Sequence, residues 1–455
     1  MTAEATEIPR DLHLQRAVKG AAQAGTTKLG ERNVVWVDID PSIHRGALSA
    51  DASGVIANAA EFALKQRIPL VMQIASSGAD IVEGIPALHG WGQAARAIAD
   101  CSGVVPTFTI VNGPAVSGPA LLIGLADFVI MTRDSYAFVS GPTMVAEFTG
   151  IQISNEDLGG IDAHAKQSGV ASLIVESVDD ARAALEHLMS FIPDNVDHVP
   201  DILATTDPID RSTPEAGEII PAVATGSYDV RRIIRSVADD EDFLEIKERW
   251  AANVITGFIT IGGEPIGVVA NQPMVLAGTL DIPASQKSAR FVSFCDAFNI
   301  PLLTFVDTPG FYPGKDLEWR GMIRHGGQLV FAYARATVPR VCVILRKSYG
   351  GAYIVMDSKT MGNDLCVAWP TAEIAVMGAG QASAILQRKA SDEEKAAFES
   401  DYSERLLNPF VAAERGYVDA VIEPSETRAQ VASAFAMLRD KRERLAPRKH
   451  DNTPL

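Results

Sequence analysis

Residues 339–355, PRVCVILRKSYGGAYIV, place an apolar run directly before Gly350, Gly351 and Ala352. The part Pro339–Leu345 predicts a buried strand, and the apolar residues after the glycines predict the start of a helix. No side chain at this junction is an obvious nucleophile, acid, base or metal ligand. A core strand therefore ends in almost bare backbone, and the recurrence of this pattern elsewhere in the chain decides the fold.

The chain repeats itself over a long range. Residues 106–122, PTFTIVNGPAVSGPALL, resemble residues 339–355, and three further segments recur in the same order. These further pairs are 67–80 with 299–312, 137–142 with 375–380, and 168–184 with 415–431. The spacing between partners grows slowly along the chain, as small insertions in the second copy would produce. The similarity therefore indicates two copies of one fold and matches Ser117 with Gly351, and Gly118 with Ala352.

Both halves show the same order of expected elements. Strands are expected at 34–39 and 266–270, and the helices that follow them at 54–65 and 284–298. Each helix leads into the sequence IPL and a second buried strand, and a third strand follows the sequence VP. Strands that alternate with helices of about 10–15 residues indicate βαβ-type units. The fold class predicted from this pattern is α/β.

The domain organisation follows from the duplication. The chain of 455 residues exceeds one ordinary hydrophobic core. We predict two similar domains at 25–205 and 228–455, an N-terminal arm at 1–24, and a linker rich in Pro, Asp and Thr at 206–227.

Composition excludes several classes of protein. A formal net charge of −17 argues against nucleic acid as a partner. No apolar stretch is long enough to span a membrane. The four cysteines form no CxxC pair or Cys/His cluster, so we expect reduced, buried thiols, no metal site and a cytoplasmic protein. They are Cys101, Cys295, Cys342 and Cys366.

The two small-residue turns, 117–119 and 350–352, have two interpretations. Small residues allow a helix to pack closely on a sheet. They also expose the first N–H groups of a helix, which have no partner inside it and favour a developing negative charge. Such an oxyanion hole, found at both turns, indicates a reaction in which two carbonyl oxygens become anionic, as in the formation of an enolate.

The usual catalytic motifs are missing from the sequence. It contains no GxSxG, P-loop or HExxH motif, and GAGQAS at 378–383 lacks the third glycine of GxGxxG. His89 and His325 are interpreted as packing or capping residues within helices. The bare turns therefore remain the strongest candidates for the catalytic site.

Long segments of the second half identify a family. The sequences VVANQPMVLAGTLDIPASQKSARFVSFCDAFNIPLLTFVDTPGFYPG, GMIRHGGQLVFAYARATVPRVCVILRKSYGGAYIVMDSKTMGND and AWPTAEIAVMGAGQASAIL closely resemble the carboxyltransferase (β) subunit of biotin-dependent acyl-CoA carboxylases of the acetyl- and propionyl-CoA type. The first half is similar through SSGADIVEGIPALHG, LADFVIM and LGGIDAHAKQSGVA. The resemblance implies a duplicated crotonase/ClpP-like ββα superhelix.

The resemblance also implies an activity and an assembly. The family moves a carboxyl group from carboxybiotin to the α-carbon of an acyl-CoA through an enolate. Carboxybiotin is carried by a separate α subunit that contains biotin carboxylase and the biotin carrier. The carboxyltransferase chains form a homo-oligomer, usually a hexamer built as a trimer of dimers. The first domain of one chain and the second domain of its partner together form the active site.

Site residues carry over by position. The catalytic N–H groups would come from Gly351 and Ala352 on the biotin side and from Ser117 and Gly118 on the acyl-CoA side. The residues expected to bind biotin are Gly350, Tyr353, Gly378 and Ala379. The residues expected to bind acyl-CoA are Gly78, Ala79, Arg45, Gly113, Gly141 and Ile354.

Three positions depart from the family pattern. Ser117 replaces the first glycine of a Gly-Gly pair, Asp80 replaces the arginine of an SGGAR motif, and Ile354 replaces an aspartate that propionyl-type members often carry. An altered acyl substrate, such as an extender unit for polyketide synthesis, is one hypothesis. A biotin-dependent decarboxylase subunit and a non-catalytic assembly subunit are the alternatives.

Overall fold

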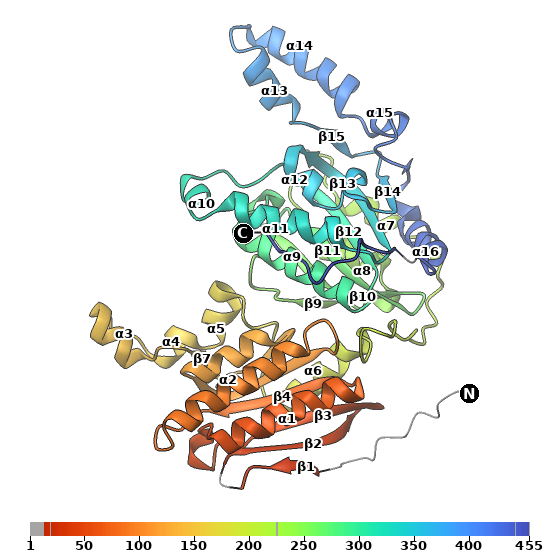
Figure 1. Ribbon diagram of the computed structural model, residues 1–455. Helices are drawn as coiled ribbons and strands as arrows, with labels where there is room; N and C mark the ends of the chain where they lie inside the picture. The colour runs from red at the N-terminus through yellow and green to blue at the C-terminus, as the bar shows by residue number, and fades with distance from the viewer. Residues whose placement is uncertain (1–12, 19, 224–225, 442, 455) are drawn as a thin grey trace. The chain divides into compact units, whose positions relative to one another are not determined.

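The computed structural model describes residues 13–18, 20–223, 226–441 and 443–454 (Figure 1). The chain divides into two compact units. The first ends at Val199 and also includes Lys247–Trp250, and the second contains Pro200–Ile246 and the chain from Ala251 onward. Each unit is built around its own eight-stranded sheet.

The first unit has the strand order β1-β2-β3-β4-β5-β6-β8, with β7 paired to β5. Only the pairs β1–β2 and β2–β3 are antiparallel. The strands are β1 (His13–Arg16), β2 (Ala22–Leu29), β3 (Arg32–Ile39), β4 (Leu70–Ser76), β5 (Thr107–Val116), β6 (Phe128–Thr132), β7 (Tyr136–Phe138) and β8 (Leu173–Val175). The helices are η1 (His44–Gly46), α1 (Ala50–Gln66), α2 (Ile85–Asp100), η2 (Gly118–Leu125), α3 (Pro142–Thr149), α4 (Asn155–Gly159), α5 (Ile161–Ala163), η3 (His164–Ser168) and α6 (Val178–Ser190).

The second unit repeats this topology, with the order β9-β10-β11-β12-β13-β14-β16 and β15 paired to β13. The strands are β9 (Leu244–Ile246), β10 (Val254–Ile261), β11 (Glu264–Asn271), β12 (Leu302–Thr308), β13 (Arg340–Tyr349), β14 (Leu365–Ala368), β15 (Glu373–Ala375) and β16 (Ala420–Val421). The helices are α7 (Pro214–Ile219), α8 (Val230–Val237), η4 (Asp239–Glu241), η5 (Leu276–Gly278), α9 (Ile282–Ala297), α10 (Lys315–Trp319), α11 (Met322–Arg335), α12 (Gly350–Val355), η6 (Lys359–Met361), α13 (Ala379–Leu386), α14 (Asp392–Tyr402), η7 (Ser403–Leu407), α15 (Pro409–Glu414), η8 (Pro424–Glu426) and α16 (Thr427–Leu438).

The central strands explain why both sheets form. All residues of β12 and all but one of β4 are buried, which is typical of parallel strands covered on both faces. In the first unit α1 packs on α2, and in the second α9 packs on α11. The duplicated α/β fold predicted from the sequence is confirmed.

The structure corrects two expected boundary segments. Residues 1–12 of the expected arm lie outside the described residues, but 13–24 include β1 and the start of β2 and so join the first sheet. The expected linker at 206–227 is packed on the second unit, because Ala216 and Ile219 of α7 are buried in its core.

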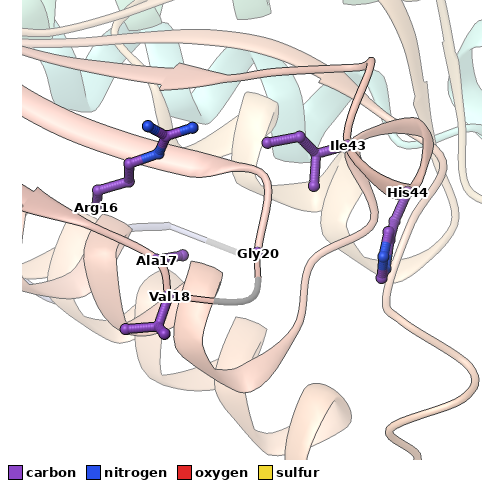
Figure 2. Close-up of a pocket in the computed structure, with 6 residues that line it drawn as sticks. All are labelled: Arg16, Ala17, Val18, Gly20, Ile43 and His44. Atoms are coloured by element: carbon purple, nitrogen blue, oxygen red, sulfur yellow. The ribbon is translucent and has the colours of Figure 1, made fainter.

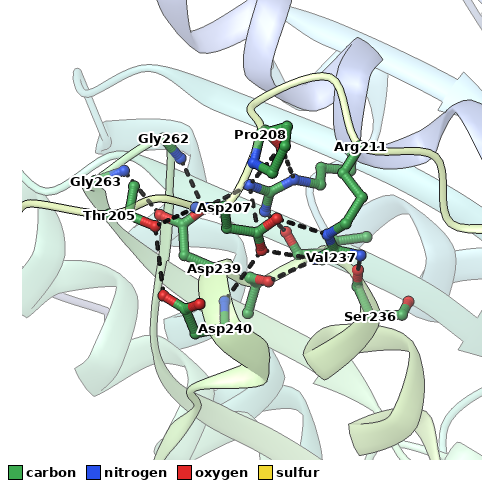
Figure 3. Close-up of polar contacts among 12 residues, drawn as sticks. Thr205, Asp207, Pro208, Arg211, Ser236, Val237, Asp239, Asp240, Gly262 and Gly263 are labelled. Atoms are coloured by element: carbon green, nitrogen blue, oxygen red, sulfur yellow. Dashed lines mark hydrogen bonds and ion pairs between the residues drawn. The ribbon is translucent and has the colours of Figure 1, made fainter.

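A buried ionic cluster fixes part of that expected linker (Figure 3). Arg428 of α16 is fully buried and donates to Asp239 at 2.6 Å and to the Pro208 carbonyl at 3.1 Å. Asp207 accepts from Arg211 at 2.7 Å. These charged contacts give the segment around residue 208 a defined place on the second unit that its composition did not predict.

Candidate active site

In the second unit the chain passes from β13 directly into α12 through residues 350–352. Gly350 has a φ of 57°, in the left-handed region that glycine adopts without strain. Among the described residues, the structure records no acceptor for the N–H groups of Gly351 and Ala352. These groups lie at the start of a helix, where no internal partner exists. The turn therefore presents two free main-chain donors.

A mainly apolar groove of about 410 Å³ opens beside this second turn. Gly350, Gly351, Tyr353 and Ile354 form part of its lining, and Ile374–Val376 form another part. Tyr353 is buried, and this burial raises the pKa of its hydroxyl, which stays protonated at neutral pH. The groove can therefore accept an uncharged ring whose carbonyl oxygen faces the free N–H groups.

Two residues expected to bind biotin lie outside the lining of this groove. Gly378 directly precedes α13, and Ala379 is the first residue of that helix. A Cβ added to Gly378 would lie 3.1 Å from the ring of Tyr349. The Tyr349 hydroxyl in turn donates a hydrogen bond to Glu373. Gly378 therefore gives the Tyr349 ring room directly before the second turn.

In the first unit the matching turn connects β5 to η2. Ser117 has φ 69° and ψ −161°, and its N–H donates to the Phe138 carbonyl at 2.9 Å. Gly118 follows, where a Cβ would lie 3.2 Å from the ring of Trp91. No described residue accepts a hydrogen bond from the Gly118 N–H. Pro119 has no N–H at all, so the first turn presents one free main-chain donor.

Sheet register corrects the way in which the sequence analysis matched the two turns. Leu70 pairs with Thr107 in the first sheet as Leu302 pairs with Arg340 in the second, and Val116 and Tyr349 each end the strand. Ser117 therefore corresponds to Gly350, and Gly118 corresponds to Gly351. The counterpart of Ala352 is Pro119. Positive φ angles at both Ser117 and Gly350 support this match.

The loops beside the turns also match in backbone but differ in chemistry. His44 and Arg45 have φ angles of 49° and 56°, and Leu276 and Ala277 at the corresponding place have 49° and 54°. Both pairs begin a short helix that precedes α1 or α9. The same backbone device thus carries two basic side chains in the first unit and two apolar side chains in the second.

The basic loop lies next to residues that were expected to bind acyl-CoA. The Arg45 carbonyl accepts from the Ser77 N–H at 3.0 Å, and Gly78 accepts from Leu48 at 2.8 Å. A Cβ on Gly78 would lie 2.9 Å from that of Ser117. Arg45, Gly78 and the adjacent Ala79 are therefore brought together near the first turn.

Two other residues expected to bind acyl-CoA have local packing roles. Gly113 lies within β5, where a Cβ would be 3.0 Å from that of Ala75. Gly141 precedes α3 and lies against the ring of Phe138. Ile354, also expected on the acyl-CoA side, lies in the groove of the second unit.

A cavity of about 580 Å³ adjoins the basic loop of the first unit (Figure 2). Its lining includes Arg16, Val18, Ile43 and His44. The His44 ring also lies 3.8 Å from the Asp80 carboxylate. Sequence reasoning missed this cavity, because Arg16 lies in a segment that had been interpreted as an arm.

The described part of the chain contains no group of His, Cys, Asp and Glu side chains that could hold a metal ion. In the same part no helix is both long and apolar enough to cross a bilayer. All four cysteines are free and buried.

The two sheets, each with a turn of small residues between a core strand and a helix, define a duplicated α/β protein of the crotonase type. The chain belongs to the carboxyl transferase domain family, whose model matches residues 9–453. It is therefore a carboxyltransferase, and the resemblance to the β subunits of acyl-CoA carboxylases is confirmed.

Individual relatives are similar over nearly the whole chain. The propionyl-CoA carboxylase beta chain of Roseobacter denitrificans is 46% identical over 97% of this chain and 87% of its own length. The methylmalonyl-CoA decarboxylase subunit alpha of Veillonella parvula is 42% identical over 91% of this chain and 82% of its own. The crystal structure of transcarboxylase 12S with methylmalonyl-coenzyme A bound matches with a TM-score of 0.93 and 39% identity, covering 96% of this chain and 85% of that one.

Proposed function

We propose that the chain transfers a carboxyl group from carboxybiotin to the α-carbon of an acyl-CoA. The observation that carries this proposal is the pair of helix-opening turns, at 117–118 and 350–352, which present free main-chain N–H groups. Hydrogen-bond donors that are fixed before the reaction stabilise negative charge as it develops on oxygen. Two such turns suit a reaction with one acceptor oxygen on each substrate.

The second unit fits the biotin group. Its groove is mainly apolar, and Tyr353 is a neutral polar residue in its lining. The N–H groups of Gly351 and Ala352 would hold the ureido oxygen, and the apolar wall that includes Ile354 would exclude water. When bound, carboxybiotin supplies the carboxyl group.

The first unit fits an acyl-CoA. Arg16 and His44 line its cavity, and Arg45 is exposed beside His44, so basic groups are available for the phosphates of coenzyme A. The apolar Leu276 and Ala277 at the matching place in the second unit offer no such groups. This difference supports the assignment of the charged substrate to the first unit.

The assembly is proposed from the relatives. The transcarboxylase 12S structure is described as a hexamer assembly, and the Roseobacter protein is a beta chain. We expect this chain to form a homo-oligomer of the same kind and to receive biotin from a separate α subunit. A cytoplasmic location remains a prediction, supported by the four free thiols.

A decarboxylase subunit is the second candidate function, because the Veillonella decarboxylase subunit is nearly as similar as the carboxylase subunits. The two activities share the transfer of a carboxyl group between biotin and an acyl-CoA and run it in opposite directions. The non-catalytic alternative is not retained, since the chain belongs to an enzyme family and keeps both donors in its second turn.

The test combines the purified chain with a biotinylated α subunit, ATP, labelled bicarbonate and a panel of acyl-CoAs. Gly351→Pro removes one donor and should lower the rate of carboxylation by about 10²–10³-fold. Gly351→Ala is the matched control, because it keeps the N–H and its Cβ would lie 3.7 Å from Phe311, an ordinary contact. Loss of labelling in both variants alike would contradict the role of this N–H, and release of CO2 from a carboxylated acyl-CoA without labelling would favour the decarboxylase.

A further inference from the structure

The first turn lacks a hydrogen-bond donor that the second turn has. The donors of the second turn are the N–H groups of Gly351 and Ala352, whose counterparts by sheet register are Gly118 and Pro119. Proline has no N–H. The neighbouring N–H of Ser117 is already donated to the Phe138 carbonyl. Of the main-chain N–H groups of residues 117–119, only that of Gly118 would therefore be free to meet an oxygen bound at the first turn.

Ser117 occupies a backbone conformation that normally requires glycine. Its φ of 69° and ψ of −161° fall in a region that residues with a side chain enter only at a cost in free energy. The corresponding residue of the second turn, Gly350, has a φ of 57° and is a glycine. Non-glycine residues in such strained conformations cluster at functional sites, where the side chain can have a role.

The side chain of Ser117 makes no visible structural contribution. It is exposed, and the structure records no hydrogen bond of its hydroxyl to any described residue. Gly78 lies next to it, and a Cβ there would approach the Ser117 Cβ to 2.9 Å. The glycine at position 78 therefore gives the serine room, and the hydroxyl is left available beside the Gly118 N–H.

We propose that the Ser117 hydroxyl is the second donor of the first oxyanion hole and replaces the N–H that is missing at Pro119. This inference rests on the proposed function, in which the first turn holds the thioester oxygen of the acyl-CoA. The α-proton would pass to the ureido nitrogen of biotin once that nitrogen has released its carboxyl group. The electron pair of the broken C–H bond would then move onto the thioester oxygen, which accepts hydrogen bonds from the Gly118 N–H and the Ser117 O–H. The serine keeps its own proton throughout and forms no covalent bond.

The experiment compares Ser117→Gly, Ser117→Ala, Pro119→Ala and the double variant Ser117→Gly/Pro119→Ala. Both single changes at Ser117 remove the hydroxyl and should lower kcat for carboxylation of the acyl-CoA by about 10²-fold, with little change in KM. Only the glycine variant also removes the backbone strain, so it should unfold at a higher temperature than the alanine variant. Similar losses of kcat in both variants would assign the effect to the hydroxyl.

The double variant is the decisive member of the set. Pro119→Ala introduces an N–H at the position that corresponds to Ala352, so it should restore at least about tenfold of the activity that Ser117→Gly loses. Release of CO2 from free N-carboxybiotin without an acyl-CoA tests the second turn, so Ser117→Gly and Ser117→Ala should lower its rate much less than they lower the rate of acyl-CoA carboxylation. An equal loss in both reactions would show that the turn acts through the wider structure and would overturn the inference.

The remaining outcomes separate this inference from the proposed function. A wild-type chain that carboxylates an acyl-CoA, together with Ser117→Gly and Ser117→Ala variants within about twofold of it, would overturn the role of the hydroxyl alone. A wild-type chain that labels no acyl-CoA with a competent α subunit would overturn the proposed function and this inference with it. Failure of Pro119→Ala to rescue a correctly folded Ser117→Gly variant would also overturn the inference.

Discussion

Replacement of Arg428 by methionine should strongly destabilise the second unit. The guanidinium is fully buried and donates to Asp239 at 2.6 Å, to the Val237 carbonyl at 2.7 Å, and twice to the Pro208 carbonyl at 3.1 Å (Figure 3). Removal of one partner of a buried ion pair costs about 3–5 kcal/mol. Asp239 would keep two backbone N–H donors, from residues 262–263. We therefore expect the lower end, a loss of about 3 kcal/mol.

The assay is urea unfolding, monitored by hydrogen exchange of the amides in β10, a strand in the sheet of the second unit. Arg439→Met is the control, because that side chain is 56% exposed and lies 3.3 Å from Glu264. An exposed ion pair of this kind contributes less than about 1 kcal/mol. If Arg428→Met shifted the free energy of unfolding by no more than the control does, the buried cluster would not hold residues 206–211 on this unit.

Three further predictions test the first unit and a buried charge. Gly46→Ala should lower the free energy of unfolding by about 2 kcal/mol or more, because φ is 70° and the new Cβ would lie 2.0 Å from the Ala75 carbonyl oxygen. Gly54→Ala has open space for the new Cβ and should raise the free energy of unfolding by about 0.5–1 kcal/mol. Urea unfolding measures both changes. Arg16→Ala should raise KM for acyl-CoA by roughly 3–10-fold with kcat nearly unchanged in initial-rate kinetics, and an unchanged KM would remove Arg16 from the substrate site. Burial raises the pKa of Asp357 from 3.8 to about 6, so the carboxyl binds a proton more tightly in the folded chain than in the unfolded chain. The free energy of unfolding should therefore fall by about 3 kcal/mol as the pH rises from about 4 to about 6. Asp357→Asn should lose this pH dependence when unfolding is measured at several pH values.

The fold could be predicted because the two halves repeat the same apolar strand sequences in the same order. These strands are almost completely buried in the structure. The strand expected at 34–39 lies within β3, and the helix expected at 284–298 differs from α9 by two residues at its start and one at its end. The expected linker was wrong because its Pro, Asp and Thr composition says nothing about the distant side chain of Arg428, on which the segment packs. Long-range ion pairs of this kind leave no local pattern in a sequence.

The sequence predicted the candidate site at two turns that the structure shows to be equivalent, but it matched them one residue out of register. The sequence match let the spacing between partners grow from 233 residues, at Pro106 and Pro339, to 234 residues at the turns, and this growth aligned Gly118 with Ala352. Matching by backbone conformation aligns Ser117 with Gly350, because both have positive φ. A sequence match rests on similar side chains, whereas a match by sheet register and φ rests on the backbone positions themselves. The one-residue shift is what reveals Pro119 in the place of a hydrogen-bond donor.

The two units have the same backbone fold but different side chains at equivalent positions around their turns. Where the second unit has Leu276 and Ala277 in its left-handed loop, the first has basic side chains in the same backbone conformation. Where the second turn relies on main-chain donors alone, the first has lost one and carries the exposed Ser117 hydroxyl. A main-chain donor is fixed by the fold and suits a ligand that does not vary, such as biotin. A side-chain donor can be replaced without rebuilding the turn, so under the proposed assignment of the substrates the acyl-CoA site can diverge while the biotin site stays constant.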